Sequence, residues 1–175
     1  GYGTTILEGI ADEAFHGENS ICITPNEGRL ALNIGKDVNA LELIDGAYYV
    51  ASVMIKSSQD VNYKVYLRVK NRPSGNPTIF KIPTTQWTKV EVVFRYDAAA
   101  AADKGQKLIF EIGLDSEKSK GGAVYFDDLQ LVRKIDATAI SLDSTLTLDP
   151  GEELLLQPTL TPVNATTSIT WTSSD

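Results

Sequence analysis

The chain has 175 residues, of which 42% are hydrophobic and 22% are charged, so it can bury a core and is not disordered as a whole. Its formal net charge is −7, and from Ile135 onward it carries six acidic residues and no Lys or Arg. No basic stripe runs along the chain, which argues against binding to the phosphate backbone of nucleic acid.

Short segments with alternating apolar and polar residues follow one another along most of the chain, separated by Gly, Pro, Asn, Asp or Ser. In chain order the predicted strands are Ser20–Thr24, Arg29–Ile34, Tyr48–Lys56, Asn62–Lys70, Thr78–Ile82, Lys89–Tyr96, Lys107–Leu114 and Ala123–Val132. The alanines from Ala98 to Ala102 are too few for a stable helix, so we expect a loop or a single helical turn there. Strands this numerous need a second sheet or closure, and the sequence therefore predicts an all-β, two-sheet sandwich of the jelly-roll kind.

The composition changes around Arg133 to Asp136. After this point Tyr, Phe and basic residues are absent, and Thr, Ser, Leu and Pro dominate. We therefore expect two domains, one over residues 1–134 and one over residues 135–175.

Cys22 is the only cysteine, so no disulfide can form within the chain, and its place between Ile21 and Ile23 predicts a buried, unreactive thiol. The chain has no apolar run of about 18 residues and no charged leader before an apolar run. It thus predicts neither a membrane span nor a signal peptide within the residues given, which leaves the compartment undetermined.

Four segments of the first part together resemble one family of modules. They are Phe15–Ile23 (FHGENSICI), Asp45–Lys56 (DGAYYVASVMIK), Trp87 with Val90, Val92 and Phe94, and Tyr125–Leu131 (YFDDLQL). In this order and spacing, over about residues 5 to 134, they resemble the jelly-roll carbohydrate-binding modules of the family 4, 9 and 22 type. The resemblance implies that Trp87 packs in the fold, and that a first strand usual in these modules is missing from this chain.

The second part resembles a group 2 bacterial immunoglobulin-like domain (BIG2). The matching segments are Ile140–Asp143 (ISLD), Leu146–Glu152 (LTLDPGE), Thr161–Thr166 (TPVNAT) and Ile169–Asp175 (ITWTSSD). The resemblance implies the first part of an immunoglobulin-like β-sandwich, which stops just after the strand that carries the core Trp171. Such domains are spacers on secreted and surface proteins, so it also implies an extracellular or cell-surface location and the presence of appended catalytic or further immunoglobulin-like domains.

The closing strand holds a candidate metal ligand. Strict alternation from Leu129 and Leu131 predicts that Asp127 and Tyr125 share their inward face, where a carboxylate needs a partner. In the resembled modules the matching Asp helps to hold a structural Ca²⁺ with oxygen ligands from the loop His16 to Asn19. The candidate ligands are therefore Asp127, Glu18, His16 and, in place of a first-strand carboxylate, Glu8. The alternative is that Asp127 accepts hydrogen bonds from backbone N–H groups.

A sugar site needs an aromatic face that stacks on a pyranose ring and planar polar groups beside it. The outward positions of the central strands offer Tyr66, Arg68 and Glu111 as the best cluster, with Met54 and Tyr48 as further candidates. Met54 stands where the resembled modules carry a stacking aromatic, so a rival hypothesis is a structural or adhesive module without sugar binding.

An enzyme is not expected. His16 is the only histidine, which leaves no histidine-centred triad or multi-histidine metal site. A hydrolase that uses two carboxylates is the third hypothesis, but the regular strands predict no deep cleft in which a carboxylate is desolvated. The sequence therefore predicts a non-catalytic module that binds a polysaccharide or oligosaccharide.

Overall fold

The structure is a computed structural model, and it describes residues 7–10, 13–24, 30–60, 64–70, 77–103, 107–115, 122–142 and 147–172. Contacts within the chain divide it into two compact units, Gly1–Val132 and Arg133–Asp175. Each unit is described by itself.

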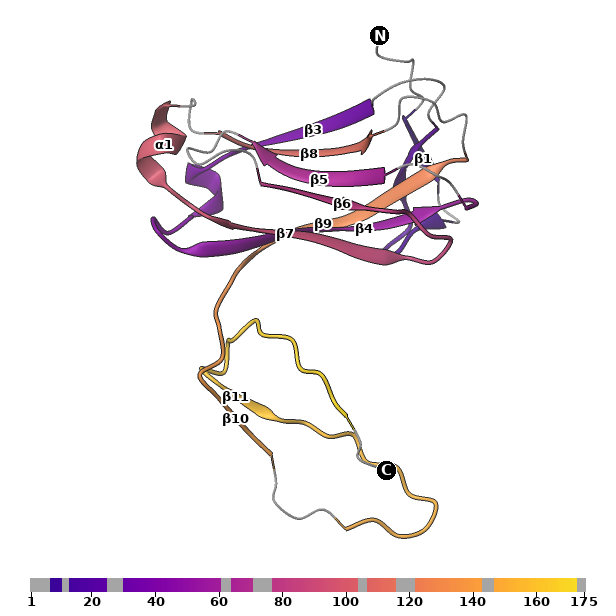
Figure 1. Cartoon of the computed structure of the whole chain (residues 1–175), viewed down its shortest axis with the longest axis vertical. Helices are drawn as coiled ribbons and strands as arrows, with labels where there is room; N and C mark the ends of the chain where they lie inside the picture. Colours follow the sequence, from indigo (N-terminus) through magenta and orange to yellow (C-terminus); the bar gives the residue numbers. More distant parts are fainter. Residues whose placement is uncertain are drawn as a thin grey trace. The chain divides into compact units, whose positions relative to one another are not determined.

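One layer of the first unit is a five-stranded antiparallel sheet with the strand order β1-β2-β9-β4-β7 (Figure 1). Its strands are β1 (Leu7–Ile10), β2 (Ser20–Ile23), β9 (Val124–Arg133), β4 (Tyr48–Ser57) and β7 (Thr88–Arg95). β7 lies at one edge of this sheet, so its side chains have a neighbouring strand on one side only.

The other layer is a four-stranded sheet with the order β3-β8-β5-β6, also antiparallel. Its strands are β3 (Leu30–Asp37), β8 (Lys107–Asp115), β5 (Lys64–Lys70) and β6 (Thr78–Lys81). β8 and β5 are internal strands. Side chains on their outer face therefore have neighbours on both sides.

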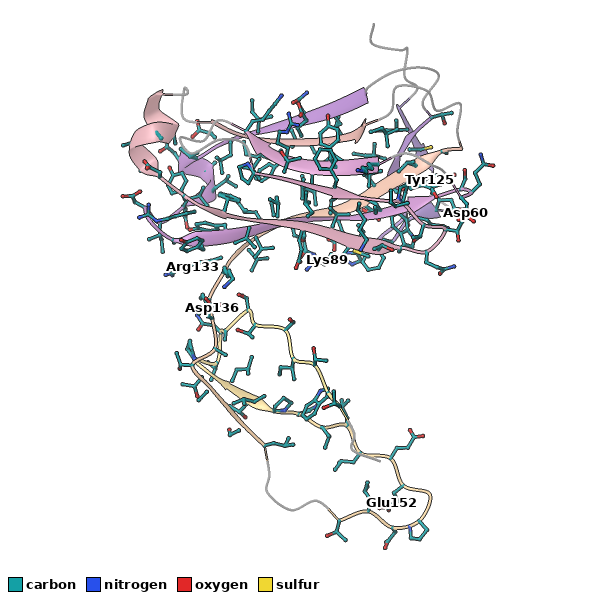
Figure 2. The ribbon with its side chains drawn as sticks, in the orientation of Figure 1. Asp60, Lys89, Tyr125, Arg133, Asp136 and Glu152 are labelled. Atoms are coloured by element: carbon teal, nitrogen blue, oxygen red, sulfur yellow. The ribbon has the colours of Figure 1, made fainter. Side chains whose placement is uncertain are left out.

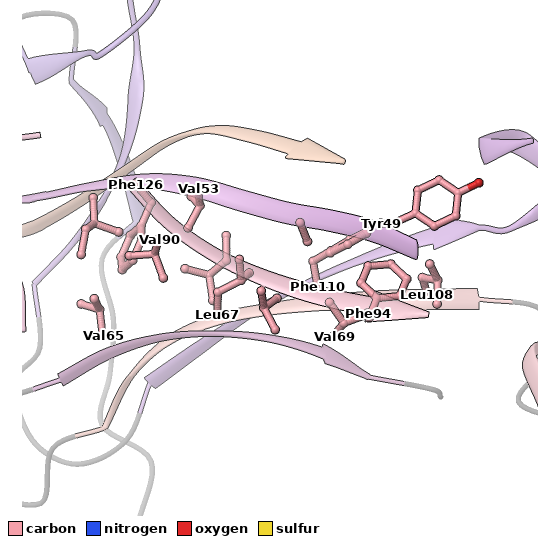
Figure 3. Packing of buried hydrophobic residues seen from close by; sticks show 14 of the residues in the cluster. Tyr49, Val53, Val65, Leu67, Val69, Val90, Phe94, Leu108, Phe110 and Phe126 are labelled. Atoms are coloured by element: carbon pink, nitrogen blue, oxygen red, sulfur yellow. The ribbon is translucent and has the colours of Figure 1, made fainter. Parts of the chain in front are cut away.

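The core lies between the two sheets. Val53 on β4 and Phe94 on β7 contribute from one layer, and Leu67 on β5 and Phe110 on β8 from the other (Figure 3). In β4, β5 and β7 every second residue is buried in this core, as the period-2 pattern of the sequence predicts. The all-β jelly-roll sandwich predicted from the sequence is confirmed.

Short helices in the connections of the first unit include η2 (Asn39–Leu41), a 3-10 turn, and α1 (Ala98–Asp103). The backbone N–H of Ala100 donates to Asp97 Oδ1 at 3.0 Å, which caps the start of α1. The alanine stretch thus forms the short helical turn that was one of the two expectations for it.

All strands predicted for the first unit are present, and one more, β1, was missed. β1 pairs antiparallel with β2, and Glu8 lies opposite Cys22 in the register. In its sequence, LEGI, the apolar residues Leu7 and Ile10 lie three positions apart, so β1 shows no period-2 alternation. β1 was not predicted, and the expectation that the first strand usual in the resembled modules is missing stays a prediction.

The second unit contains one antiparallel pair, β10 (Ala139–Ser141) and β11 (Thr159–Thr161). The segment before β10 is also bonded to the segment after β11. Ile135 N donates to Thr166 Oγ1, and Ala137 N donates to Thr167 Oγ1, both at 2.8 Å. Trp171 is 51% exposed. Its described residues thus form a hairpin-like pair with largely exposed apolar side chains.

Candidate functional site

The outer face of the four-stranded sheet brings together side chains from all four of its strands. In the register Glu111 on β8 lies between Asn33 on β3 and Arg68 on β5, and Tyr66 on β5 lies opposite Phe80 on β6. Since paired residues in an antiparallel sheet share a face, these side chains are neighbours. We call the following set the sheet-face cluster: Asn33, Tyr66, Arg68, Lys70, Thr78, Phe80 and Glu111.

Glu111 is the charged centre of the sheet-face cluster. It is only 6% exposed. Its Oε1 lies 3.3 Å from Arg68 Nη1, and its Oε2 forms an ion pair with Lys70 Nζ. Lys70 Nζ also donates to Asn33 Oδ1 at 3.4 Å. A buried carboxylate is costly unless it is paired, and two cations from the neighbouring strand meet that need here.

Arg68 is held in one orientation by three different groups. Its Nε donates to Thr78 Oγ1 at 2.9 Å, its Nη1 faces Glu111, and its Cζ lies 5.3 Å from the centre of the Tyr66 ring. That last distance suits a cation–π contact. A guanidinium fixed in this way can recognise a polar ligand with little loss of side-chain entropy.

Phe80 is the aromatic residue that the sequence analysis missed. Its ring centre lies 5.8 Å from that of Tyr66, with 52° between the planes. Tyr66 is 7% exposed, whereas Phe80 is 43% exposed. Phe80 therefore offers an accessible ring, and the largely buried ring of Tyr66 lies beside it. Pairing the predicted strand Thr78–Ile82 with Asn62–Lys70 would have placed Phe80 beside Tyr66, but the pairing of strands is not visible in one sequence.

Two predicted sugar contacts lie elsewhere. Tyr48 and Met54 are outward-facing residues of β4, which belongs to the five-stranded sheet, opposite Arg95 and Lys89 of β7. Figure 2 marks Lys89 on this layer. Tyr48 and Met54 therefore do not join the cluster of Tyr66, Arg68 and Glu111, because alternation shows that a residue faces outward but not which sheet it faces outward from.

The predicted direction of Asp127 was also wrong. Val124 and Phe126 are in the core, and farther along β9 Leu129 and Leu131 pack against the core. The alternation therefore changes phase between Phe126 and Leu129. Asp128 lies there with a positive φ of 51°, a conformation that Asp tolerates better than most residues. This is the geometry of a β-bulge, which strict counting by two cannot anticipate.

Asp127 accepts hydrogen bonds from three backbone N–H groups. Its Oδ2 takes those of Phe15 at 2.8 Å and His16 at 2.9 Å, and its Oδ1 takes that of Asp128 at 2.7 Å. These bonds fasten the loop before β2 to the bulge in β9. Acceptance of backbone N–H groups is the alternative role given above for Asp127. In this arrangement the loop presents donors rather than oxygen ligands to the carboxylate.

The other predicted calcium ligands are His16, Glu18 and Glu8, and His16 contacts Asp127 through its backbone N–H. The His16 and Glu18 side chains are exposed, and the side chain of Glu8 lies outside the described part of the chain. Among the described residues, no group of three or more His, Cys, Asp or Glu side chains is placed to hold a metal ion. A structural Ca²⁺ stays a prediction, with a test given below.

Trp87 lies at the start of β7 and packs edge-on against Phe15, with ring centres 5.8 Å apart and 61° between the planes. It is partly buried. This contact fits the predicted packing role for Trp87, and it joins the loop before β2 to the five-stranded sheet.

Comparison with known proteins finds no matching family profile and no matching curated protein. Solved structures do match. TmCBM61, a carbohydrate-binding module in complex with β-1,4-galactotriose, is 16% identical with a TM-score of 0.52, over 76% of this chain and 90% of that one. The C-terminal family 22 module of Clostridium thermocellum Xyn10B is 12% identical with a TM-score of 0.50, over 75% and 83%.

A third match belongs to a structural study of promiscuous carbohydrate-binding modules of the β-sandwich superfamily. It is 13% identical with a TM-score of 0.54, and it covers 74% of this chain and 53% of that one. No helix in the described part of the chain is long and apolar enough to cross a membrane. At these identities the matches show the fold alone, which is the jelly-roll β-sandwich of carbohydrate-binding modules.

Proposed function

We propose that the first unit is a non-catalytic carbohydrate-binding module that holds a polysaccharide or oligosaccharide on the sheet-face cluster. The observation that carries the proposal is the exposed ring of Phe80 beside the fixed Arg68–Glu111 pair. An aromatic face takes the apolar side of a pyranose, and planar charged groups beside it bond to the hydroxyl groups at the ring edge. Several solved structures with this fold are named as carbohydrate-binding modules, which supports the proposal.

The second unit fits a spacer role in this proposal. Its sequence resembles a group 2 bacterial immunoglobulin-like domain, and that resemblance supports a secreted or surface protein in which further domains are attached. A binding module raises the local concentration of an attached catalytic domain at its polymer. The rival function is a structural or adhesive module that keeps the sandwich without binding sugar.

Binding to a broad glycan array, followed by titration of the best ligand, tests the proposal. Phe80→Ala is expected to weaken binding about fivefold, since stacking on an aromatic ring contributes on the order of 1 kcal/mol. Tyr48→Ala is the matched control, because Tyr48 is an aromatic residue of 53% exposure on the other sheet. It is expected to leave affinity unchanged.

Three results would contradict the proposal. Failure of the folded chain to bind any glycan favours the structural or adhesive role. Equal losses in the Phe80 and Tyr48 variants would remove the sheet-face cluster as the site. Cleavage of a bound glycan, measured as new reducing ends, would contradict the non-catalytic role.

A further inference from the structure

The charge exposed at the sheet-face cluster is positive, although the whole chain carries a formal net charge of −7. Two cations, Arg68 and Lys70, pair with the single carboxylate of Glu111. The Glu111 side chain is 8% exposed, whereas those of Arg68 and Lys70 are 31% and 32% exposed. A ligand on this face therefore meets two accessible cations and a carboxylate that is largely covered.

The other charged side chains that the structure describes on this face do not cancel the excess. Lys64, at the start of β5, shares the outward parity of Tyr66 and is exposed. Asp37, at the end of β3, accepts a hydrogen bond from the backbone of Asn39 through its Oδ1 at 2.8 Å. Among the described side chains of the face, the centre thus keeps one positive charge more than it has negative.

Both cations keep donors for a ligand. Lys70 has three N–H donors, of which one meets Glu111 and one meets Asn33 Oδ1. Arg68 uses Nε for Thr78 and Nη1 for Glu111. Its Nη2 has no hydrogen-bond acceptor among the described residues. A planar anionic group fits these remaining donors better than a neutral hydroxyl group does, because charged hydrogen bonds are roughly twice as strong as neutral ones.

We infer that this face prefers acidic glycans, in which a sugar ring carries a carboxylate, as in a uronic acid. The inference rests on the proposed function. Phe80 and Arg68 are diagonal neighbours on adjacent strands, about 7 to 8 Å apart between Cα atoms. The C5 carboxylate of a hexuronic acid projects from the edge of its ring. A ring stacked on Phe80 can therefore place its carboxylate on the side of Arg68, beyond which Lys70 follows on the same strand.

The test compares each acidic oligosaccharide with its carboxyl-reduced form, in which every carboxylate becomes a CH₂OH group on the same backbone. The probes are an oligogalacturonate and an oligoglucuronate, titrated into the full chain by calorimetry. At low ionic strength we expect an acidic form to bind about tenfold tighter than its reduced form. At about 0.5 M salt the preference is expected to fall below about threefold, because salt screens charges on an accessible face.

Two variants assign the preference to the cluster. Lys70→Gln is expected to bring the ratio of the two affinities below about threefold, while Lys70→Arg, which keeps the charge, retains the preference. A thermal melt of each variant shows that it is folded.

Failure of this inference differs from failure of the proposed function. Equal binding of acidic and reduced forms, or an unchanged ratio in Lys70→Gln, overturns the preference for acidic glycans. Binding of neutral glycans that Phe80→Ala weakens would then still support the proposed function. Failure of the chain to bind any glycan overturns both.

Discussion

Two glutamates in the middle of strands show how differently the two outer faces of the sandwich are built. Glu111 on β8 is 6% exposed and pairs with Arg68 and Lys70, whereas Glu91 on β7 has a side chain that is 53% exposed and pairs, among the described residues, with Lys89 at 3.1 Å. β8 is an internal strand and β7 is an edge strand. Neighbours on both sides cover Glu111 and fix its partners, while Glu91 stays in water.

The comparison teaches that outward-facing is not the same as accessible. On the four-stranded sheet, Arg68 and Lys70 pair with Glu111 of the adjacent strand. The exposed ring of Phe80 lies on the same face. On the five-stranded sheet, Tyr48 and Val93 are 53% and 46% exposed. A preorganised surface loses less entropy on binding, which favours the first face as the site.

The largest effect is expected from removing Glu111. Glu111→Ala leaves the partly exposed Arg68 and Lys70 without their shared partner and should lower the free energy of unfolding by about 2 kcal/mol, the cost of lost hydrogen bonds to charged groups. Urea denaturation measures this loss. Glu111→Gln keeps the shape and part of the hydrogen bonding and is expected to lose less. A change below about 1 kcal/mol in the alanine variant would show that the network contributes little to stability.

Asp127 is expected to have the next largest effect. Asp127→Ala removes the acceptor of the Phe15 and His16 N–H groups and should lower the free energy of unfolding by about 1 to 2 kcal/mol. The same protein tests the calcium prediction. If Asp127 helps to hold Ca²⁺, a chelator lowers the melting temperature of the unaltered chain and not that of the variant. A chelator without effect on either protein contradicts the calcium prediction.

A smaller effect is confined to alkaline pH. Burial raises the pKa of Tyr125, and the charges of Cys22 and Glu13 raise it further. Below pH 10, near the ordinary tyrosine pKa, both states hold the proton and stability does not depend on this group. Above it the unfolded chain loses the proton first, so stability falls as the pH rises.

Tyr125→Phe is expected to make that decline shallower. Part of the decline in stability is expected to remain in this variant, because burial also raises the pKa of Tyr96. Unfolding free energies at about pH 9 and pH 11 measure the difference between the two proteins. A variant whose decline is as steep as that of the unaltered chain would show that Tyr125 does not carry the effect.

The smallest effect is expected at Glu91. Glu91→Gln should change the free energy of unfolding by less than about 0.5 kcal/mol, because the Lys89–Glu91 pair is exposed and screened. A loss as large as that of Glu111→Gln would remove the distinction between the two faces.

The sequence predicted the strands better than it predicted the site. The parity of β5 and β8 placed Tyr66, Arg68 and Glu111 outward, and the register places Arg68 directly opposite Glu111. Alternation along β4 likewise placed Tyr48 and Met54 outward, but this strand belongs to the other sheet. A single sequence does not show which sheet a strand joins. Phe80 was missed for the same reason, since its role depends on the pairing of β5 with β6.

The sequence by itself determined the all-β class and the buried face of most strands, because alternation is a local property of a half-buried strand. Only the tertiary structure decided which outward residues meet. Strand order brought Phe80, Arg68, Lys70 and Glu111 to one face, and the bulge at Asp128 turned Asp127 toward the loop before β2. Both depend on contacts between segments far apart in the chain, which local periodicity does not encode.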